Sequence, residues 1–289
     1  MTAPYAISRK ASGSPTVKNI KNFRILLAIL FFLATLTFLF ISRGVHPVSV
    51  LAERVQVIPS AIAVCMGVTA FWFVVTLLFG RVYCSTVCPV GTLSDIMMTF
   101  RRRVLRRGKG FRYRHRFQAR NELLIGYLIC LVLGLGAVPF IMEPWNIMRN
   151  VASTVNPAAT ATTWQTLGIG MGAGIVAGLV TIVAVMVWSF FRGRDFCNSI
   201  CPLGTAMGLL ENHTLFHIEI DPDKCISCMK CEEGCRSSCI RVAARQVDNS
   251  RCVRCFSCLD SCPADAIRFQ INRNRPATPL FRRKQRSVN

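Results

Sequence analysis

The run Cys252-Val253-Arg254-Cys255-Phe256-Ser257-Cys258-Leu259-Asp260-Ser261-Cys262-Pro263 places four cysteines at intervals of three, three and four residues. An earlier run repeats this spacing with Cys225, Cys228, Cys231 and Cys235. Three thiolates this close together can wrap one corner of an iron–sulfur cubane, while the fourth points to a second cluster. We expect that fourth cysteine at the start of the next helix. The two runs predict two [4Fe–4S] clusters.

The spacing also predicts crossed ligand sets. The first cluster takes Cys225, Cys228, Cys231 and Cys262, and the second takes Cys252, Cys255, Cys258 and Cys235. Paired C-x2-C elements also bind zinc, but eight cysteines at this double spacing favour iron–sulfur clusters. One departure leaves an alternative open: Cys235 is followed by Arg236-Ser237-Ser238-Cys239, where the motif normally continues with proline. Cys239 is either a substitute ligand or a bystander, and the spacing favours Cys235.

Short alternating segments flank the two runs, at residues 217–220 and 264–269, and predict two strands. Together with the cysteines they predict a small α+β domain of the bacterial 2[4Fe–4S] ferredoxin type over residues 211–272. Such a domain is held together largely by its clusters. A basic tail, residues 273–289, follows it.

Upstream of this domain the chain is strongly apolar, with 52% hydrophobic residues overall and a mean hydropathy of +0.41. Four stretches contain no Asp, Glu, Lys, Arg or His: Ile25–Ile41, Val57–Phe79, Leu123–Ile141 and Leu167–Phe191. Each is close to the roughly 20 residues that an α-helix needs to cross a bilayer. Residues 25–210 are therefore expected to form an α-helical membrane domain of four spans.

The basic residues predict the orientation of these spans. Of 35 Lys and Arg residues, 32 lie in segments 1–24, 80–122 and 192–289. This asymmetry predicts a multi-pass protein of the bacterial inner membrane with both termini in the cytoplasm, segment 1–24 being a basic N-terminus. The first apolar stretch has no small-residue cleavage site, so we expect a retained anchor. Topology and anionic lipid explain the net charge of +21 without a nucleic-acid partner.

Thirteen of the fifteen cysteines lie in segments assigned to the reducing cytoplasm, where thiols persist and clusters are assembled. The other two, Cys65 and Cys130, lie within spans, and we expect them to act as small buried hydrophobic residues.

An internal repeat follows the second and fourth spans. Residues 80–92 and 193–205 share the pattern Gly-Arg-x-aromatic-Cys-x3-Cys-Pro-x-Gly-Thr, which makes the membrane domain a pair of repeated hairpins. The paired cysteines, four residues apart, are expected on one face of a helical turn. They are Cys84 with Cys88, and Cys197 with Cys201. They are candidates for a further cluster or for redox thiols, and the structural alternative is that they merely stabilise the helix ends.

Missing motifs narrow the chemistry further. The sequence has no C-x-x-C-H for covalent haem, and none of its four histidines lies in a predicted span, so we expect no haem. It has no phosphate-binding glycine motif, and no span contains a charged residue that could relay ions. Electron transfer is the function that remains.

The four spans, the two C-x3-C-P elements and the C-terminal cysteine runs together resemble the NapH and MauN family of membrane ferredoxins, over about residues 20–270. The likeness extends more loosely to the iron–sulfur halves of NosR and CcoG. It implies an electron-transfer subunit of a quinol dehydrogenase complex that draws on the quinone pool. The expected recipient is a periplasmic ferredoxin-like or cytochrome partner feeding a reductase.

The alternative that the resemblance leaves open is a MauN-like electron-transfer or maturation factor for a periplasmic metalloenzyme or methylamine dehydrogenase. For a quinol site the sequence offers Glu143, Trp145 and Arg149 near the third span and His46 near the first. Trp145 and Trp164 are more simply interpreted as aromatic-belt anchors.

Overall fold

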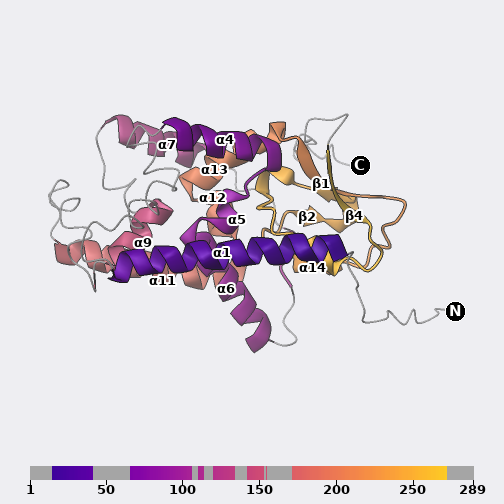
Figure 1. The fold of residues 1–289 in the computed structure, drawn as a ribbon, viewed down its shortest axis with the longest axis horizontal. Coiled ribbons are helices and arrows are strands. Elements are labelled where there is room, and N and C mark those ends of the chain that lie inside the picture. Colours follow the sequence, from indigo (N-terminus) through magenta and orange to yellow (C-terminus); the bar gives the residue numbers. More distant parts are fainter. Residues whose placement is uncertain are drawn as a thin grey trace, which may run out of the picture.

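The computed structural model describes residues 15–41, 66–105, 110–113, 120–133, 142–152, 154 and 171–271. The N-terminal part is helical: α1 (Pro15–Ile41), α4 (Met66–Phe79), α5 (Tyr83–Thr86), α6 (Pro89–Val104), α7 (Arg120–Val132), α9 (Pro144–Ala152), α11 (Met171–Arg192), α12 (Asp195–Ser199) and α13 (Pro202–Leu210). The C-terminal part mixes short helices with strands. In Figure 1 the longest helices run along the long axis of the molecule, and the strands gather at one end.

Two of the described helices are long and apolar enough to cross a membrane. Their apolar segments are Asn19–Thr37 in α1 and Ile175–Arg192 in α11, and a third apolar helix, Gly67–Phe79, is shorter. The described parts of α4 and α7 cover only part of the second and third predicted spans, since residues 57–65 and 134–141 lie outside the described residues. A count of four spans therefore stays a prediction.

Helix α9 differs from the expectation for residues just outside a span. It packs against α11 and α6, and Trp145 on it is only 2% exposed. α9 packs closely on α11 because Gly178 of α11 has no side chain. A Cβ at position 178 would lie only 2.4 Å from the Cβ of Asn150 on α9. An aromatic-belt anchor faces lipid and interfacial water, so that interpretation of Trp145 is wrong for this structure. Trp164 lies outside the described residues.

The internal repeat appears as two matching series of helices, α4–α5–α6 and α11–α12–α13. In each series a glycine with positive φ ends the apolar helix, at Gly80 (φ 80°) and Gly193 (φ 70°). The paired cysteines do not share one continuous helical turn, which corrects the expectation from spacing. Cys88 and Cys201 are extended, with ψ of 117° and 121°, because a residue before proline is driven away from the helical region.

The C-terminal domain has two small antiparallel pairs of strands. β1 (Phe216–Ile220) pairs with β4 (Ile267–Ile271), and β2 (Ile240–Arg241) pairs with β3 (Gln246–Val247). β1 and β4 correspond to the two strands predicted from alternation, with β4 beginning three residues later than expected. The domain also contains helices α14 (Lys230–Gly234) and α15 (Ser257–Ser261).

The fourth cysteine of each run was expected at the start of a helix, but it lies at the C-terminal end of one. Cys235 directly follows α14 and Cys262 directly follows α15, each in an extended conformation. The short helices instead carry the third cysteines, Cys231 and Cys258. A residue at the C-terminal end can turn its sulfur away from the pocket formed by its own run.

Candidate iron–sulfur sites

The first predicted ligand set surrounds a cavity in the C-terminal domain. A small cavity is lined by Cys225, Cys228, Cys231 and Cys262, with Ile220, Val242 and Ile267 among its apolar walls. The structure thus brings Cys262 from the second run to the three cysteines of the first. Apolar walls and four thiols fit a cubane, whose ligation by these residues stays a prediction.

The second set surrounds another small cavity in the same domain. Its lining includes Cys235, Cys252, Cys255 and Cys258, and also Cys239. Among the residues that the structure describes, no three His, Cys, Asp or Glu side chains converge closely enough to hold a single metal ion. The thiols surround these two cavities instead.

The two halves of the domain repeat each other at an offset of 27 residues. Left-handed backbone conformations recur in three pairs: Ser227 and Arg254, Met229 and Phe256, Ser238 and Asp265. The fourth cysteines also match, since the Cys235 sulfur accepts from the Cys239 amide at 3.4 Å and the Cys262 sulfur from the Ala266 amide at 3.3 Å. Amide donors of this kind stabilise thiolates that ligate a cluster.

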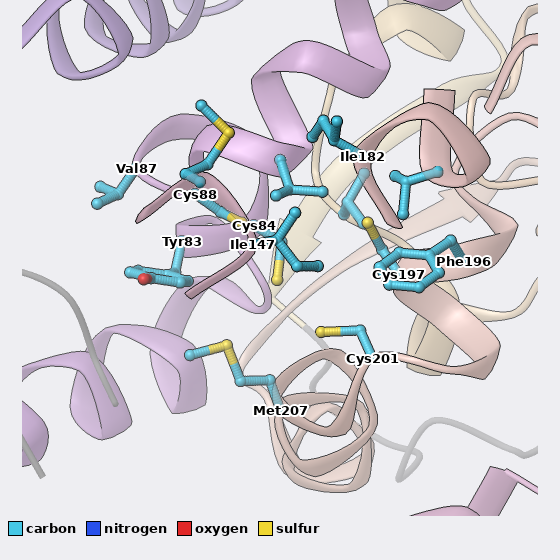
Figure 2. Close-up of a cluster of buried hydrophobic side chains, with 14 of the residues drawn as sticks. Tyr83, Cys84, Val87, Cys88, Ile147, Ile182, Phe196, Cys197, Cys201 and Met207 are labelled. Atoms are coloured by element: carbon cyan, nitrogen blue, oxygen red, sulfur yellow. The ribbon is translucent and has the colours of Figure 1, made fainter. Parts of the chain in front are cut away.

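The four cysteines of the C-x3-C-P elements meet in one buried core. Cys84, Cys88, Cys197 and Cys201 are each 4–6% exposed, although the two elements are separated by 113 residues. Figure 2 shows them gathered around Ile147 of α9. The same core contains Cys255 of the C-terminal domain. The sequence alone could not show that the two elements lie together. In the structure all four thiols belong to one core.

Burial governs the protonation of these four thiols. It raises the pKa of Cys84 to about 11, against the opposing influence of Arg81, and it raises the pKa of Cys88, Cys197 and Cys201 as well. Reactive redox cysteines are solvent-accessible, which these side chains are not. Their burial therefore favours metal ligation over exposed redox thiols.

The glycine and threonine of each element explain why the repeat conserves its pattern between copies. A Cβ on Gly91 would lie 2.2 Å from the Cys84 carbonyl oxygen, and one on Gly204 would lie 2.0 Å from that of Cys197. The following threonines, Thr92 and Thr205, donate to the carbonyls of Cys88 and Cys201 at 3.3 and 3.0 Å. Each element is thus folded tightly onto its own cysteines.

We expect Gly204→Ala to lower the free energy of unfolding by about 2–3 kcal/mol, because the new methyl group collides with backbone rather than a movable side chain. Thermal unfolding in detergent measures the effect. Gly67→Ala is the matched control, since nothing lies within 4 Å of its Cβ, and it should be neutral or slightly stabilising. Equal effects of the two substitutions would contradict the packing explanation.

Two arginines connect the elements by a reciprocal exchange. Arg81 of the first element donates to the Gly204 carbonyl of the second at 2.9 Å, and Arg194 of the second donates to the Gly91 carbonyl of the first at 3.1 Å. Gly91 and Gly204 occupy equivalent positions in the repeat. Arg194 also donates to the Cys84 carbonyl at 2.6 Å. Both guanidinium groups are fully buried.

Two carboxylates anchor this arrangement. Asp95 accepts from Arg194 at 2.8 Å and pairs with Arg236 at 2.8 Å and Arg24 at 3.3 Å. Burial alone would raise the pKa of Asp95, but these guanidinium groups hold it well below its usual range. Since Arg24 lies on α1 and Arg236 in the C-terminal domain, Asp95 joins three parts of the chain.

Glu211 plays the corresponding role for the first element. It accepts from Arg81 at 3.1 Å and pairs with Arg254 at 3.4 Å. Arg254 stands between Cys252 and Cys255 and also donates to the Phe79 carbonyl at the end of α4, at 3.2 Å. No local sequence pattern indicates a role for Asp95, Glu211 or Arg254. The recurrence of arginine in both copies of the repeat was the only signal that could have found Arg81 and Arg194.

The other candidate residues are distributed differently. Glu143, at the start of α9, is buried, accepts a hydrogen bond from Asn146, and has a pKa that burial raises to about 7. Cys130 lies on α7, where its side chain is partly buried by protein. His46 and Cys65 lie outside the described residues.

Comparisons with known proteins agree with an iron–sulfur function. A family model described as a 4Fe–4S binding domain matches residues 62–108 and 175–219, so each match contains one C-x3-C-P element. No solved structure matches the chain.

Several characterised sequences are similar at low identity. The putative electron transport protein YccM of Escherichia coli is 26% identical over 194 residues, covering 62% of this chain and 48% of that protein. The ferredoxin-type protein NapH of Haemophilus influenzae is 26% identical, covering 54% and 47%. The methylamine utilization ferredoxin-type protein MauN of Paracoccus denitrificans is 28% identical, covering 61% and 56%.

The matched part of the chain thus spans about half the length of these relatives. The matching family model describes 4Fe–4S binding, and NapH and MauN are named as ferredoxin-type proteins. The chain is therefore a homologue of the ferredoxin-type proteins NapH and MauN and of YccM.

Proposed function

We propose that this chain is a four-span protein of the bacterial inner membrane that takes electrons from quinol and delivers them to a periplasmic ferredoxin-like or cytochrome partner. Two [4Fe–4S] clusters occupy the C-terminal domain, and a third occupies the core formed by Cys84, Cys88, Cys197 and Cys201. Both termini lie in the cytoplasm. The proposal extends the electron-transport function of the family to a particular donor and a particular set of centres.

The observation that carries the proposal is the shared core of the C-x3-C-P thiols and Cys255. Cys255 belongs to the second predicted ligand set, so the third site adjoins the second one without intervening solvent. Arg254, next to Cys255 in sequence, fastens the C-terminal domain to the end of α4. This arrangement supports a continuous series of centres from the membrane helices into the C-terminal domain.

An excess of buried positive charge around the thiol core supports the presence of negatively charged iron–sulfur clusters there. Five guanidinium groups share only two carboxylates there; the arginines are Arg24, Arg81, Arg194, Arg236 and Arg254, and the acids are Asp95 and Glu211. Buried positive charge without enough counter-charge is strongly destabilising. Arg81 interacts electrostatically with Cys84, Cys197 and Cys252. Thiolate-ligated clusters would supply the negative charge that the carboxylates do not.

The outer faces of the helices support a membrane location. Large apolar side chains are exposed on α1, α4, α7 and α11, among them Leu26, Phe71, Ile129 and Val183, which are 53–63% exposed. Apolar faces of this kind suit lipid rather than water. The split of basic residues supports a cytoplasmic location for the cysteine-rich end of the molecule.

Quinol oxidation releases protons as well as electrons, so a quinol site needs a proton acceptor. Glu143 meets this need because it is buried and directly precedes α9, the helix that brings Ile147 into the thiol core. A carboxyl group with a pKa near 7 is suited to accept a proton at neutral pH. We assign Glu143 this role in preference to Trp145 and Arg149, neither of which is a base at neutral pH.

The proposal is tested with anaerobically purified protein returned to lipid vesicles. We expect about twelve iron and twelve sulfide per chain, and reduction of the clusters on addition of a quinol, followed by electron paramagnetic resonance. Glu143→Gln should retain the iron but slow the reduction. Zinc without sulfide would contradict electron transfer. Clusters that quinol does not reduce would contradict the quinol donor and favour the maturation role.

A further inference from the structure

The second cluster site has one thiol more than a cubane can bind. Five cysteines line its cavity, and the fifth, Cys239, is 1% exposed. The Cys239 sulfur lies 3.4 Å from the sulfur of Cys235 and is also within hydrogen-bond reach of the sulfur of Cys252. A thiol in that position contacts two predicted ligand atoms.

The repeat within the domain shows which of the two cysteines is the extra one. Cys239 corresponds to Ala266 in the other half, just as Cys235 corresponds to Cys262. The amides of Cys239 and Ala266 donate to the preceding cysteine sulfurs at 3.4 and 3.3 Å.

The carbonyls of this pair match as well. The Cys239 carbonyl accepts a hydrogen bond from the Asp248 backbone amide, and the Ala266 carbonyl accepts one from the Asp221 backbone amide, both at 2.8 Å. Asp221 and Asp248 are themselves 27 residues apart. The backbone at Cys239 is therefore the backbone that a buried alanine adopts in the first site, and the thiol group is the difference between the two halves.

We propose that Cys239 is not a cluster ligand but a positioning residue, whose S–H group donates a hydrogen bond to the ligand sulfur of Cys235 and makes the second cluster easier to reduce than the first. A hydrogen bond to a ligand sulfur stabilises the more negative, reduced cluster, and such bonds are among the factors that set cluster potentials. The first site has no such donor at Ala266. This inference rests on the proposed presence of both clusters in the C-terminal domain.

The consequence is a built-in difference between two otherwise matching centres. The second site includes Cys255, which lies in the core shared with the C-x3-C-P thiols. The easier cluster to reduce is thus the one next to the membrane core. Electrons arriving from that core would rest there before moving to the first cluster.

The test uses redox titration of the full-length protein, followed by electron paramagnetic resonance. Cys239→Ala should keep the iron content of wild type while the potential of one cluster becomes more negative and the other is unchanged. Cys239→Ser keeps a donor and should restore the potential to at least the wild-type value. The mirror substitution, Ala266→Cys, adds a donor beside Cys262 and should raise the potential of the first cluster.

The outcomes separate this inference from the proposed function. Loss of about four iron in Cys239→Ala, with full iron in Cys235→Ala, would make Cys239 the ligand and overturn the inference. Unchanged potentials in Cys239→Ala with full iron would overturn it too. Wild-type protein without iron and sulfide would instead refute the presence of the clusters themselves.

Discussion

Replacing any one of Cys84, Cys88, Cys197 or Cys201 by serine should remove about four iron per chain and leave about eight. The four side chains lie in a single buried core, so each is expected to hold one corner of the same cluster. The two clusters proposed for the C-terminal domain are assigned to separate cavities and should remain. Iron and sulfide analysis measures the loss, and quinol-dependent reduction should fall to background.

The matched control is Cys130→Ser, because Cys130 lies on α7 outside both elements. It should leave iron content and quinol-dependent reduction unchanged. If the four thiols were a redox switch instead, iron would stay constant and alkylation would vary with the state of the quinone pool. Normal electron transfer in the quadruple serine variant would defeat both functional interpretations and leave a purely structural role.

Asp95→Asn should be the most damaging substitution of a charged residue, lowering the free energy of unfolding by about 3–5 kcal/mol. Asparagine keeps the shape of the side chain but leaves Arg194, Arg236 and Arg24 without their shared carboxylate. Arg194 has no exposed surface through which water could compensate. Thermal unfolding in detergent measures the loss.

Asp260→Asn provides the control, since the Asp260 pair with Lys21 is partly exposed and should contribute less than about 1 kcal/mol. The pH dependence gives a second check. The folded-state pKa of Asp95 is lowered, so its stabilisation is present above the unfolded pKa of about 3.9 and is lost as pH falls further. The difference between wild type and Asp95→Asn should stay constant from pH 7 to pH 5 and shrink below about pH 4. A similar loss in both variants would contradict the special role of Asp95.

The sequence predicts those features of the sites that depend on short spacing. The grouping of Cys262 with Cys225 follows from the cysteine intervals, and the strands β1 and β4 follow from alternation near the two runs. Pro89 and Pro202 explain why the paired cysteines do not share a single helical turn, because each forces the cysteine before it into an extended conformation. The prediction from residues four apart did not take these prolines into account.

Contacts between distant residues could not be predicted in this way. Arg194 and Asp95 are 99 residues apart, and no local pattern pairs them. Helix α9 is a further example, because a charge count places its segment outside the spans without indicating that it packs onto α11 at Gly178. Both features depend on how the two halves of the repeat fit together, and that fit is a property of the surfaces of both halves.

The exchange of arginines between the two elements also imposes an order of events during synthesis. Arg81 is made before each of its partners Asn198, Gly204 and Glu211, which follow it by 117, 123 and 130 residues. Until the ribosome has completed Glu211, the first element cannot reach its final conformation. On the proposed assignment of Cys84, Cys88, Cys197 and Cys201 to one cluster, metal delivery to the first pair must therefore await synthesis of the second.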